Sequence, residues 1–230
     1  MIRKSFLTSA TLALFLGMTP AMGQSLADID QVGDNNTANV DQLGANNTAR
    51  VRQEGDSTAT ADVTQEGAEN LVDIARETTT DDRSSSDTVN IEQVGDSNSV
   101  TMAHNSDSYS IGAQSLTAIQ TGDGNEVAIN RQQGGGNTMD FDQEGNDNLI
   151  TTTQQQGTFE SAIEVEQFGD NNVARSNQQA GGGSLGPDQS RITVSQIGND
   201  NISDTKQSRG NSVVNVSQGG NSNSSTVTQY

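Results

Sequence analysis

The stretch QVGDNNTANVDQLGANNTARVRQ, which runs from Gln31 to Gln53, contains two copies of an eleven-residue unit. In each unit, Gln-x-Gly-x-x-Asn precedes an alternating segment that ends on the next glutamine, as in Ala38-x-Val40-x-Gln42. Apolar residues at every second position indicate a β-strand with one buried face. Glycine and asparagine accept positive φ, so the Gly-x-x-Asn stretch indicates a tight turn.

The same unit recurs along the chain. Gln-x-Gly-x-x-Asn occurs ten times, beginning at Gln31, Gln42, Gln65, Gln93, Gln120, Gln132, Gln143, Gln167, Gln196 and Gln218. Gln53 nearly matches, with Thr58 in the asparagine place. Helical spacing of apolar residues is not sustained anywhere after residue 23. The repeat therefore predicts strands and turns in regular alternation.

Two strands and two turns in about 22 residues make one coil of a flattened β-solenoid, an all-β fold also described as a parallel β-helix. Successive coils stack at an inter-strand distance of about 4.8 Å. The chain has room for roughly eight or nine coils, each stabilised by its neighbours rather than by a core of its own.

Glutamine at the end of each inward face would be costly to bury alone, because an unpaired amide loses its hydrogen bonds to water. Stacking like residues removes that cost, since each amide can donate to one neighbour and accept from the other. We therefore predict an assembly ladder formed by Gln31, Asn36, Gln42, Asn47, Gln53, Gln65, Gln93, Asn98, Gln120, Asn125, Gln143, Asn148, Gln167, Asn172, Gln178, Gln196, Asn201, Gln207, Gln218, Asn223 and Gln229. The expected turn glycines are Gly33, Gly44, Gly55, Gly67, Gly95, Gly122, Gly145, Gly169, Gly198 and Gly220.

Some positions depart from the unit. Arg76, His104 and Arg131 stand where glutamine is expected. They are interpreted either as tolerated drift at a solenoid corner or as weakened coils that restrain premature polymerisation. Irregular excursions from coil corners are predicted near residues 77–87, 105–115 and 180–189; these segments could instead divide the solenoid into blocks.

The first 23 residues have the layout of a secretory signal peptide. Arg3 and Lys4 precede an apolar stretch from Phe6 to Met18, and a small-x-small cleavage site ends at Gly23. The alternative is an uncleaved anchor. We expect a mature repeat region of residues 24–230, whose net charge is −21, because the net charge of the whole chain is −19 and the removed segment carries two positive charges. Such an acidic chain repels phosphate backbones, so no nucleic-acid partner is expected.

Composition offers little for chemistry. The chain has one histidine and no cysteine, which excludes a multi-histidine metal site, thiol chemistry and disulfides. Most carboxylates fall on turns or outward strand positions, where a solvated face is the simple interpretation. Weak Ca²⁺ binding at the oxygen-rich turns is the open alternative. We expect no catalytic residue, no cofactor and no enzyme activity.

The repeat resembles that of the curlins, Ser-x5-Gln-x-Gly-x-x-Asn-x-Ala-x3-Gln. Complete matches are Ser25, Gln31, Gly33, Asn36, Ala38 and Gln42, and Ser161, Gln167, Gly169, Asn172, Ala174 and Gln178. The units that begin at Ser190 and Ser212 match with serine in the alanine place. The resemblance implies a secreted subunit of a cell-surface amyloid fibre (a curli-type fimbrium or pilus) that serves adhesion and biofilm matrix. It also implies an outer-membrane secretion channel, periplasmic chaperones, and a curlin-like nucleator or major subunit as partners.

Two functions follow from different uses of the same fold. A structural polymer subunit would use its open coil ends as templates for further copies. A monomeric secreted β-solenoid adhesin or binding module would need protected ends. The repeat continues to Gln229, which favours the polymer.

Overall fold

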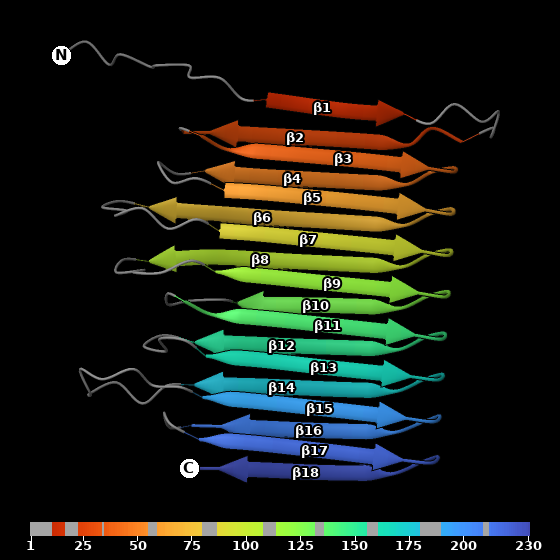
Figure 1. Ribbon diagram of the computed structural model, residues 1–230, viewed down its shortest axis with the longest axis vertical. Helices are drawn as coiled ribbons and strands as arrows, with labels where there is room; N and C mark the ends of the chain where they lie inside the picture. The colour runs from red at the N-terminus through yellow and green to blue at the C-terminus, as the bar shows by residue number, and fades with distance from the viewer. Residues whose placement is uncertain are drawn as a thin grey trace.

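The computed structural model describes residues 11–16, 23–33, 35–54, 59–79, 87–107, 114–131, 136–155, 161–179, 190–208 and 212–230. These residues form two nine-stranded sheets, and strands that follow one another in sequence alternate between them (Figure 1). Sheet A contains β1 (Thr11–Leu16), β3 (Thr37–Leu43), β5 (Ala59–Glu66), β7 (Asp87–Val94), β9 (Ser115–Thr121), β11 (Thr138–Glu144), β13 (Ala162–Phe168), β15 (Arg191–Ile197) and β17 (Val213–Gly219). Sheet B contains β2 (Leu26–Val32), β4 (Thr48–Glu54), β6 (Leu71–Thr79), β8 (Ser99–Asp107), β10 (Glu126–Arg131), β12 (Leu149–Gln155), β14 (Val173–Gln179), β16 (Ile202–Gln207) and β18 (Ser224–Gln229).

Every strand pairs in parallel with the strand two places along the chain, so the fold is the predicted β-solenoid. Equivalent repeat positions are superposed, as where Gln143 of β11 pairs with Gln167 of β13. Equivalent glutamines of neighbouring coils are 22 residues apart in the shortest coils and 29 apart in the longest. The expected 22 residues are therefore the minimum coil, to which some coils add residues.

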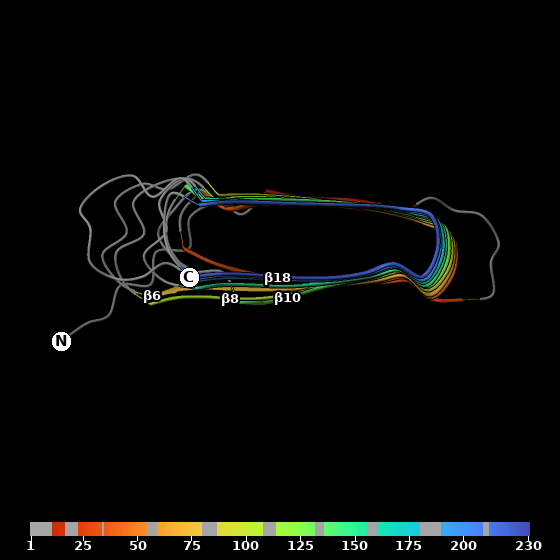
Figure 2. The same ribbon diagram turned by 90° about the horizontal axis from the view of Figure 1, so that it is seen from below.

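The core is a thin layer between the two sheets (Figure 2). Side chains alternate in and out along each strand, and the inward positions of the middle coils are almost fully buried, as Val89 and Ile91 are in β7. Sheet A keeps apolar residues at these positions from Ala38 to Val216. The inward residues of sheet B change along the stack. Ile74 and Met102 fill the core in the early coils, whereas the later coils carry the small hydroxyl residues Thr152, Ser176, Ser203 and Thr205.

The two narrow edges of the solenoid differ. From β3 onward, every connection from sheet A to sheet B is a four-residue Gly-x-x-Asn turn, which we call an arc, and the eight arcs from 44–47 to 220–223 stack on one edge (Figures 1 and 2). Connections from sheet B back to sheet A vary in length, and the strand ends that they join lie at the opposite edge. Uniform arcs can superpose, whereas a corner of variable length can absorb insertions without disturbing the ladders.

The three expected excursions all connect sheet B to sheet A, so they leave from the edge opposite the arcs. Strands β6 and β8 extend into the first two, to Thr79 and Asp107. The central parts, residues 80–86, 108–113 and 180–189, lie outside the described residues.

Strand β1 lies within the segment that the sequence predicts to be a signal peptide. It pairs with β3, with Leu16 opposite Gln42. The remainder of that segment, residues 1–10 and 17–22, lies outside the described residues. Over the part of the chain that the structure describes, no helix has the length and apolarity needed to cross a membrane.

Candidate functional site

The most regular polar feature is a column of eight glutamines at the arc end of sheet A. Its members are Gln42, Gln65, Gln93, Gln120, Gln143, Gln167, Gln196 and Gln218. Each Nε2 donates to the Oε1 of the next glutamine over 2.7–2.9 Å, without interruption. The column arises because one glutamine ends the inward face of each strand and the parallel register superposes these positions.

The same amides also join the two sheets. Each Nε2 donates a second hydrogen bond to the carbonyl oxygen at the start of a sheet B strand, over 3.0–3.3 Å, as from Gln143 to Glu126 and from Gln167 to Leu149. Both N–H groups are therefore used inside the solenoid. This cross-sheet contact was not expected from the sequence, because spacing shows which residues stack but not what lies across the core.

The arcs carry a second ladder, formed by the asparagine that ends each Gly-x-x-Asn. Its Oδ1 accepts the backbone N–H of the next arc asparagine over 2.9–3.1 Å. Its Nδ2 donates to the carbonyl oxygen of the next arc glycine over 2.7–2.9 Å. Direct amide-to-amide bonds are added only from Asn148 onward. The asparagine column thus mainly connects side chain to backbone.

Glycine is required at the start of the arc for two reasons. The arc glycines have φ near +115°, as at Gly145 (119°) and Gly169 (115°), which L side chains rarely adopt. A Cβ at Gly145 would also lie 2.2 Å from the carbonyl oxygen of Gly169 in the next coil. Nine of the ten predicted turn glycines have positive φ; Gly55 lies outside the described residues.

A further row of hydrogen bonds follows the exposed second position of the arcs. The side-chain Oδ1 of Asp96, Asp123, Asn146, Asp170, Asn199 or Asn221 accepts the backbone N–H of the preceding arc over 2.7–3.0 Å. The three aspartates among them therefore have a structural role in the arc, beyond the solvated surface expected of acidic residues.

The glutamine column of sheet B is interrupted, in contrast to that of sheet A. Gln31 donates to Gln53 over 2.8 Å, and the column resumes from Gln154 to Gln178 and Gln207 over 2.9 and 3.0 Å. Arg76 takes the next place after Gln53, and the Nε2 of Gln53 has no hydrogen-bond partner. Arginine has no acceptor to offer it.

Arg76 is buried and forms an ion pair with Asp87 at the start of β7. The pair crosses from sheet B to sheet A at the edge opposite the arcs, and Asp87 Oδ1 also accepts the backbone N–H of Gln114. This pairing explains how a charge is accommodated at a glutamine position. His104 follows Arg76 in the backbone register, whereas Arg131 lies beyond a register irregularity in β10 and pairs with Thr153.

The structure separates the predicted ladder residues into these columns. Asn36 is not among the arc asparagines; it lies at the other edge, next to Ala59. Gln229 pairs in register with Gln207 at the last described coil. Two buried members, Asn70 and Gln154, were absent from the predicted set. Asn70 completes the Gln65 unit, and Gln154 lies eleven residues after Gln143, so the repeat could have identified both.

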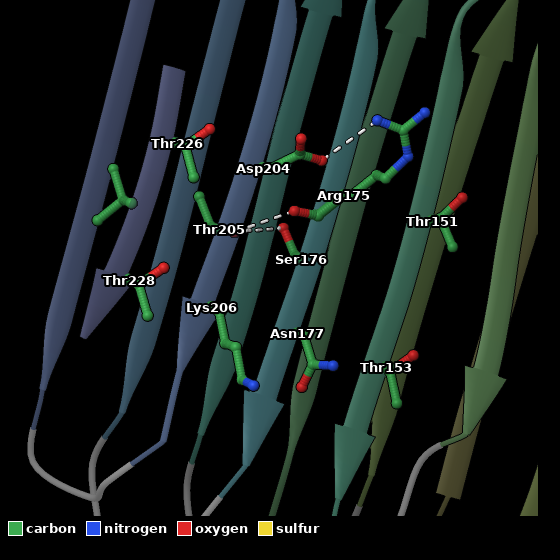
Figure 3. A pocket seen from close by; sticks show the side chains of 11 residues that line it. Thr151, Thr153, Arg175, Ser176, Asn177, Asp204, Thr205, Lys206, Thr226 and Thr228 are labelled. Atoms are coloured by element: carbon green, nitrogen blue, oxygen red, sulfur yellow. Dashed lines mark hydrogen bonds and ion pairs between the residues drawn. The ribbon is translucent and has the colours of Figure 1, made fainter. Parts of the chain in front are cut away.

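The described surface shows little that suggests a catalytic or metal-binding site. No three His, Cys, Asp or Glu side chains of the described residues are grouped so as to hold a metal ion. A shallow depression of about 310 Å³ lies on the outer face of sheet B, over β12, β14, β16 and β18 (Figure 3). Its rim is formed by hydroxyl, amide and charged side chains.

Residues 25–55 match the family model of the curlin-associated repeat. This match supports the resemblance of the chain to the curlins, whose repeat and β-solenoid are structural rather than catalytic. No curated protein and no solved structure matches the chain.

Proposed function

We propose that this chain, which carries a curlin-associated repeat and folds as a β-solenoid, is the structural subunit of an extracellular, curli-type amyloid fibre that serves adhesion and biofilm matrix. The mature subunit comprises residues 24–230, is exported through an outer-membrane channel with the help of periplasmic chaperones, and adds to copies of itself or to a curlin-like nucleator. It has no enzyme activity and needs no cofactor.

The observation that carries this proposal is the polarity of the sheet A glutamine ladder. Every glutamine donates toward the C-terminal end of the stack. At one end, Gln42 Oε1 is buried and accepts no hydrogen bond. At the other end, Gln218 Nε2 donates to the Ile202 carbonyl but has no further glutamine to bond. A second copy stacked head to tail, with its β2 on β18, would continue this polarity and bring its Gln42 acceptor to the end that carries the Gln218 donor.

The terminal coils support the same conclusion. No inward side chain of β2 or β18 is fully buried, whereas those of the middle coils are. Strands β17 and β18 pair on one edge only, with β15 and β16. Another rung would bury the apolar inward face and satisfy the free backbone groups, which together favour association.

At the other end, β1 occupies the edge of β3. The proposal assigns β1 to the export signal, so that its removal after residue 23 would leave β2 as the first strand of the mature subunit, open to pairing with β18 of a second copy.

The test is assembly of purified residues 24–230, followed by thioflavin T fluorescence and circular dichroism. We expect a shift to β structure over hours, and shortening of the lag by preformed fibres of the same protein. A protein that stays monomeric under these conditions, with or without seeds, would contradict the proposal and favour the monomeric adhesin.

A further inference from the structure

The outer face of sheet B changes its character along the stack. On the sheet B strands β12, β14, β16 and β18, the described outward side chains carry two positive charges, on Arg175 and Lys206, and one negative charge, on Asp204. Arg175 pairs with Asp204 over 3.2 Å, whereas Lys206 takes part in no ion pair of the described residues. In a chain of net charge −19, this surface has a local excess of positive charge.

The same face is also recessed. Ser176 and Thr205 replace the larger Ile74 and Met102 of earlier coils on the inner side of sheet B. Thr205 Oγ1 donates to Ser176 Oγ over 3.1 Å, so these hydroxyls are satisfied within the thin core. Sheet B can then approach sheet A more closely, and β18 lies nearer to sheet A than β6, β8 and β10 do (Figure 2). The depression in Figure 3 results, with Arg175, Asn177 and Lys206 in its lining.

The outer face of sheet A has the opposite charge at a similar height. Strands β11 and β13 present five carboxylates, namely Asp140, Asp142, Glu144, Glu164 and Glu166. Only Glu164 has an ion-pair partner among the described residues, Arg191 at 2.5 Å. The pKa of Asp140 is raised by partial burial and by Glu164, and that of Asp142 by partial burial, Glu144 and Asp140. Crowded carboxylates of this kind gain from a nearby cation.

We propose that the recessed sheet B face of one subunit, around Lys206 and Arg175, docks laterally against the acidic sheet A face of a second copy, around Asp140 and Glu164. The two surfaces lie on opposite faces of the flat solenoid, so one subunit can use both at once (Figure 2). Both have the same rung spacing, about 4.8 Å, which lets charges meet repeatedly along parallel axes. This inference rests on the proposed fibre: end-to-end stacking elongates it, and the lateral contact bundles it.

The experiment compares fibre bundling by electron microscopy, with elongation followed by thioflavin T. Lys206→Glu is expected to lower the fraction of laterally paired fibres about tenfold, because like charges placed opposite each other disfavour an interface. Arg50→Glu is the matched control: it lies on the outer face of sheet B in β4 and changes the net charge equally. It should leave pairing unchanged.

A charge exchange completes the test. Fibres of the double variant Lys206→Glu with Asp140→Lys should regain pairing, whereas Lys206→Glu with Asp62→Lys, in the same outward column of sheet A, should not. Equal effects of Lys206→Glu and Arg50→Glu, or no recovery on exchange, would overturn the inference. Unpaired wild-type fibres would overturn this inference alone, whereas absence of fibres would overturn the proposed function as well.

Discussion

The arc glycine combines two constraints at a single residue. At Gly145 the backbone requires a φ of 119°, and the carbonyl oxygen of Gly169 in the next coil fills the space of a side chain. Neither constraint depends on the identity of the neighbouring side chains. The glycine therefore reports the closeness of successive coils as well as the shape of the turn.

We expect Gly145→Ala to weaken fibres, because strained φ alone costs on the order of 1–3 kcal/mol and the neighbouring coil must move as well. The guanidinium concentration that dissolves half of the fibres should fall. Gly219→Ala is the matched control, since its φ is not in the strained range and a Cβ there would meet nothing within 4 Å. Equal effects of the two substitutions would contradict the stacking account of the arc.

The glutamine ladder makes a second prediction at this scale. Gln143→Ala should remove the acceptor of Gln120, the donor to Gln167 and the donor to the Glu126 carbonyl. Each buried group left unpaired costs about 1–3 kcal/mol, so fibre stability and growth should both fall. Asn39→Ala is the control, because it removes a hydrogen bond on the exposed face, from the side-chain amide of Asn39 to the carboxylate of Asp62. Unchanged growth for Gln143→Ala would count against the ladder.

At the scale of the element, the coil formed by β6 and β7 differs from its neighbours. Its Arg76–Asp87 pair takes the place of a glutamine amide and a small corner residue. A buried charge without its partner is costly, whereas removal of both members of a pair is often neutral.

We therefore expect Asp87→Ala alone to destabilise the solenoid by about 3–5 kcal/mol. The double variant Arg76→Gln with Asp87→Ser, which introduces the residues found in regular coils, should recover most of the loss and give Gln53 an acceptor. Denaturant midpoints of the two variants provide the comparison. A double variant as unstable as the single one would show that the pair is not the source of the effect.

The acidic strand β11 predicts a dependence on pH. The pKa values of Asp140 and Asp142 are raised above the ordinary 3.8 in the folded state. A raised carboxyl pKa means that the folded form binds protons more readily, so the contribution to stability is present at low pH and is lost as pH rises through the raised pKa. Replacement of both by asparagine should reduce the loss of stability seen on raising the pH above 3.8; an unchanged pH profile would contradict this prediction.

The repeat predicted much of this at the level of elements. The alternation of apolar and polar residues predicted the strands, and the fixed spacing of Gln-x-Gly-x-x-Asn predicted their parallel stacking. Both features could be predicted because each depends on a local sequence pattern. The sequence did not distinguish the two edges of the solenoid, since Gly33 and Gly44 begin similar turns on opposite edges. It also could not show that Gln143 spans the core or that Arg76 meets Asp87, because those contacts depend on what lies across the interior.

At the scale of the whole molecule, charge opposes assembly. The mature chain has a net charge of −21 spread over roughly nine coils. Successive subunits in a fibre therefore repel each other. Salt screens this repulsion, and the Debye length is about 8–10 Å at physiological ionic strength. We expect elongation to accelerate when NaCl is raised from about 20 to about 200 mM. A rate that falls over this range would indicate that attraction between charges drives elongation.

The central claim is that copies continue one another's rungs with β18 of one copy over β2 of the next, so that Gln229 lies over Gln31, and a disulfide can measure that register because the chain has no cysteine of its own. In that register Thr228 of β18 lies over Asp30 of β2 of the next copy, at a spacing of about 4.8 Å that suits a disulfide. Fibres of mature protein carrying Thr228→Cys and Asp30→Cys should cross-link into covalent multimers on mild oxidation, whereas Thr228→Cys with Val51→Cys, a buried position on the next strand of sheet B, should not. Absence of multimers in the first fibres, or equal multimers in both, would contradict end-to-end continuation of the solenoid.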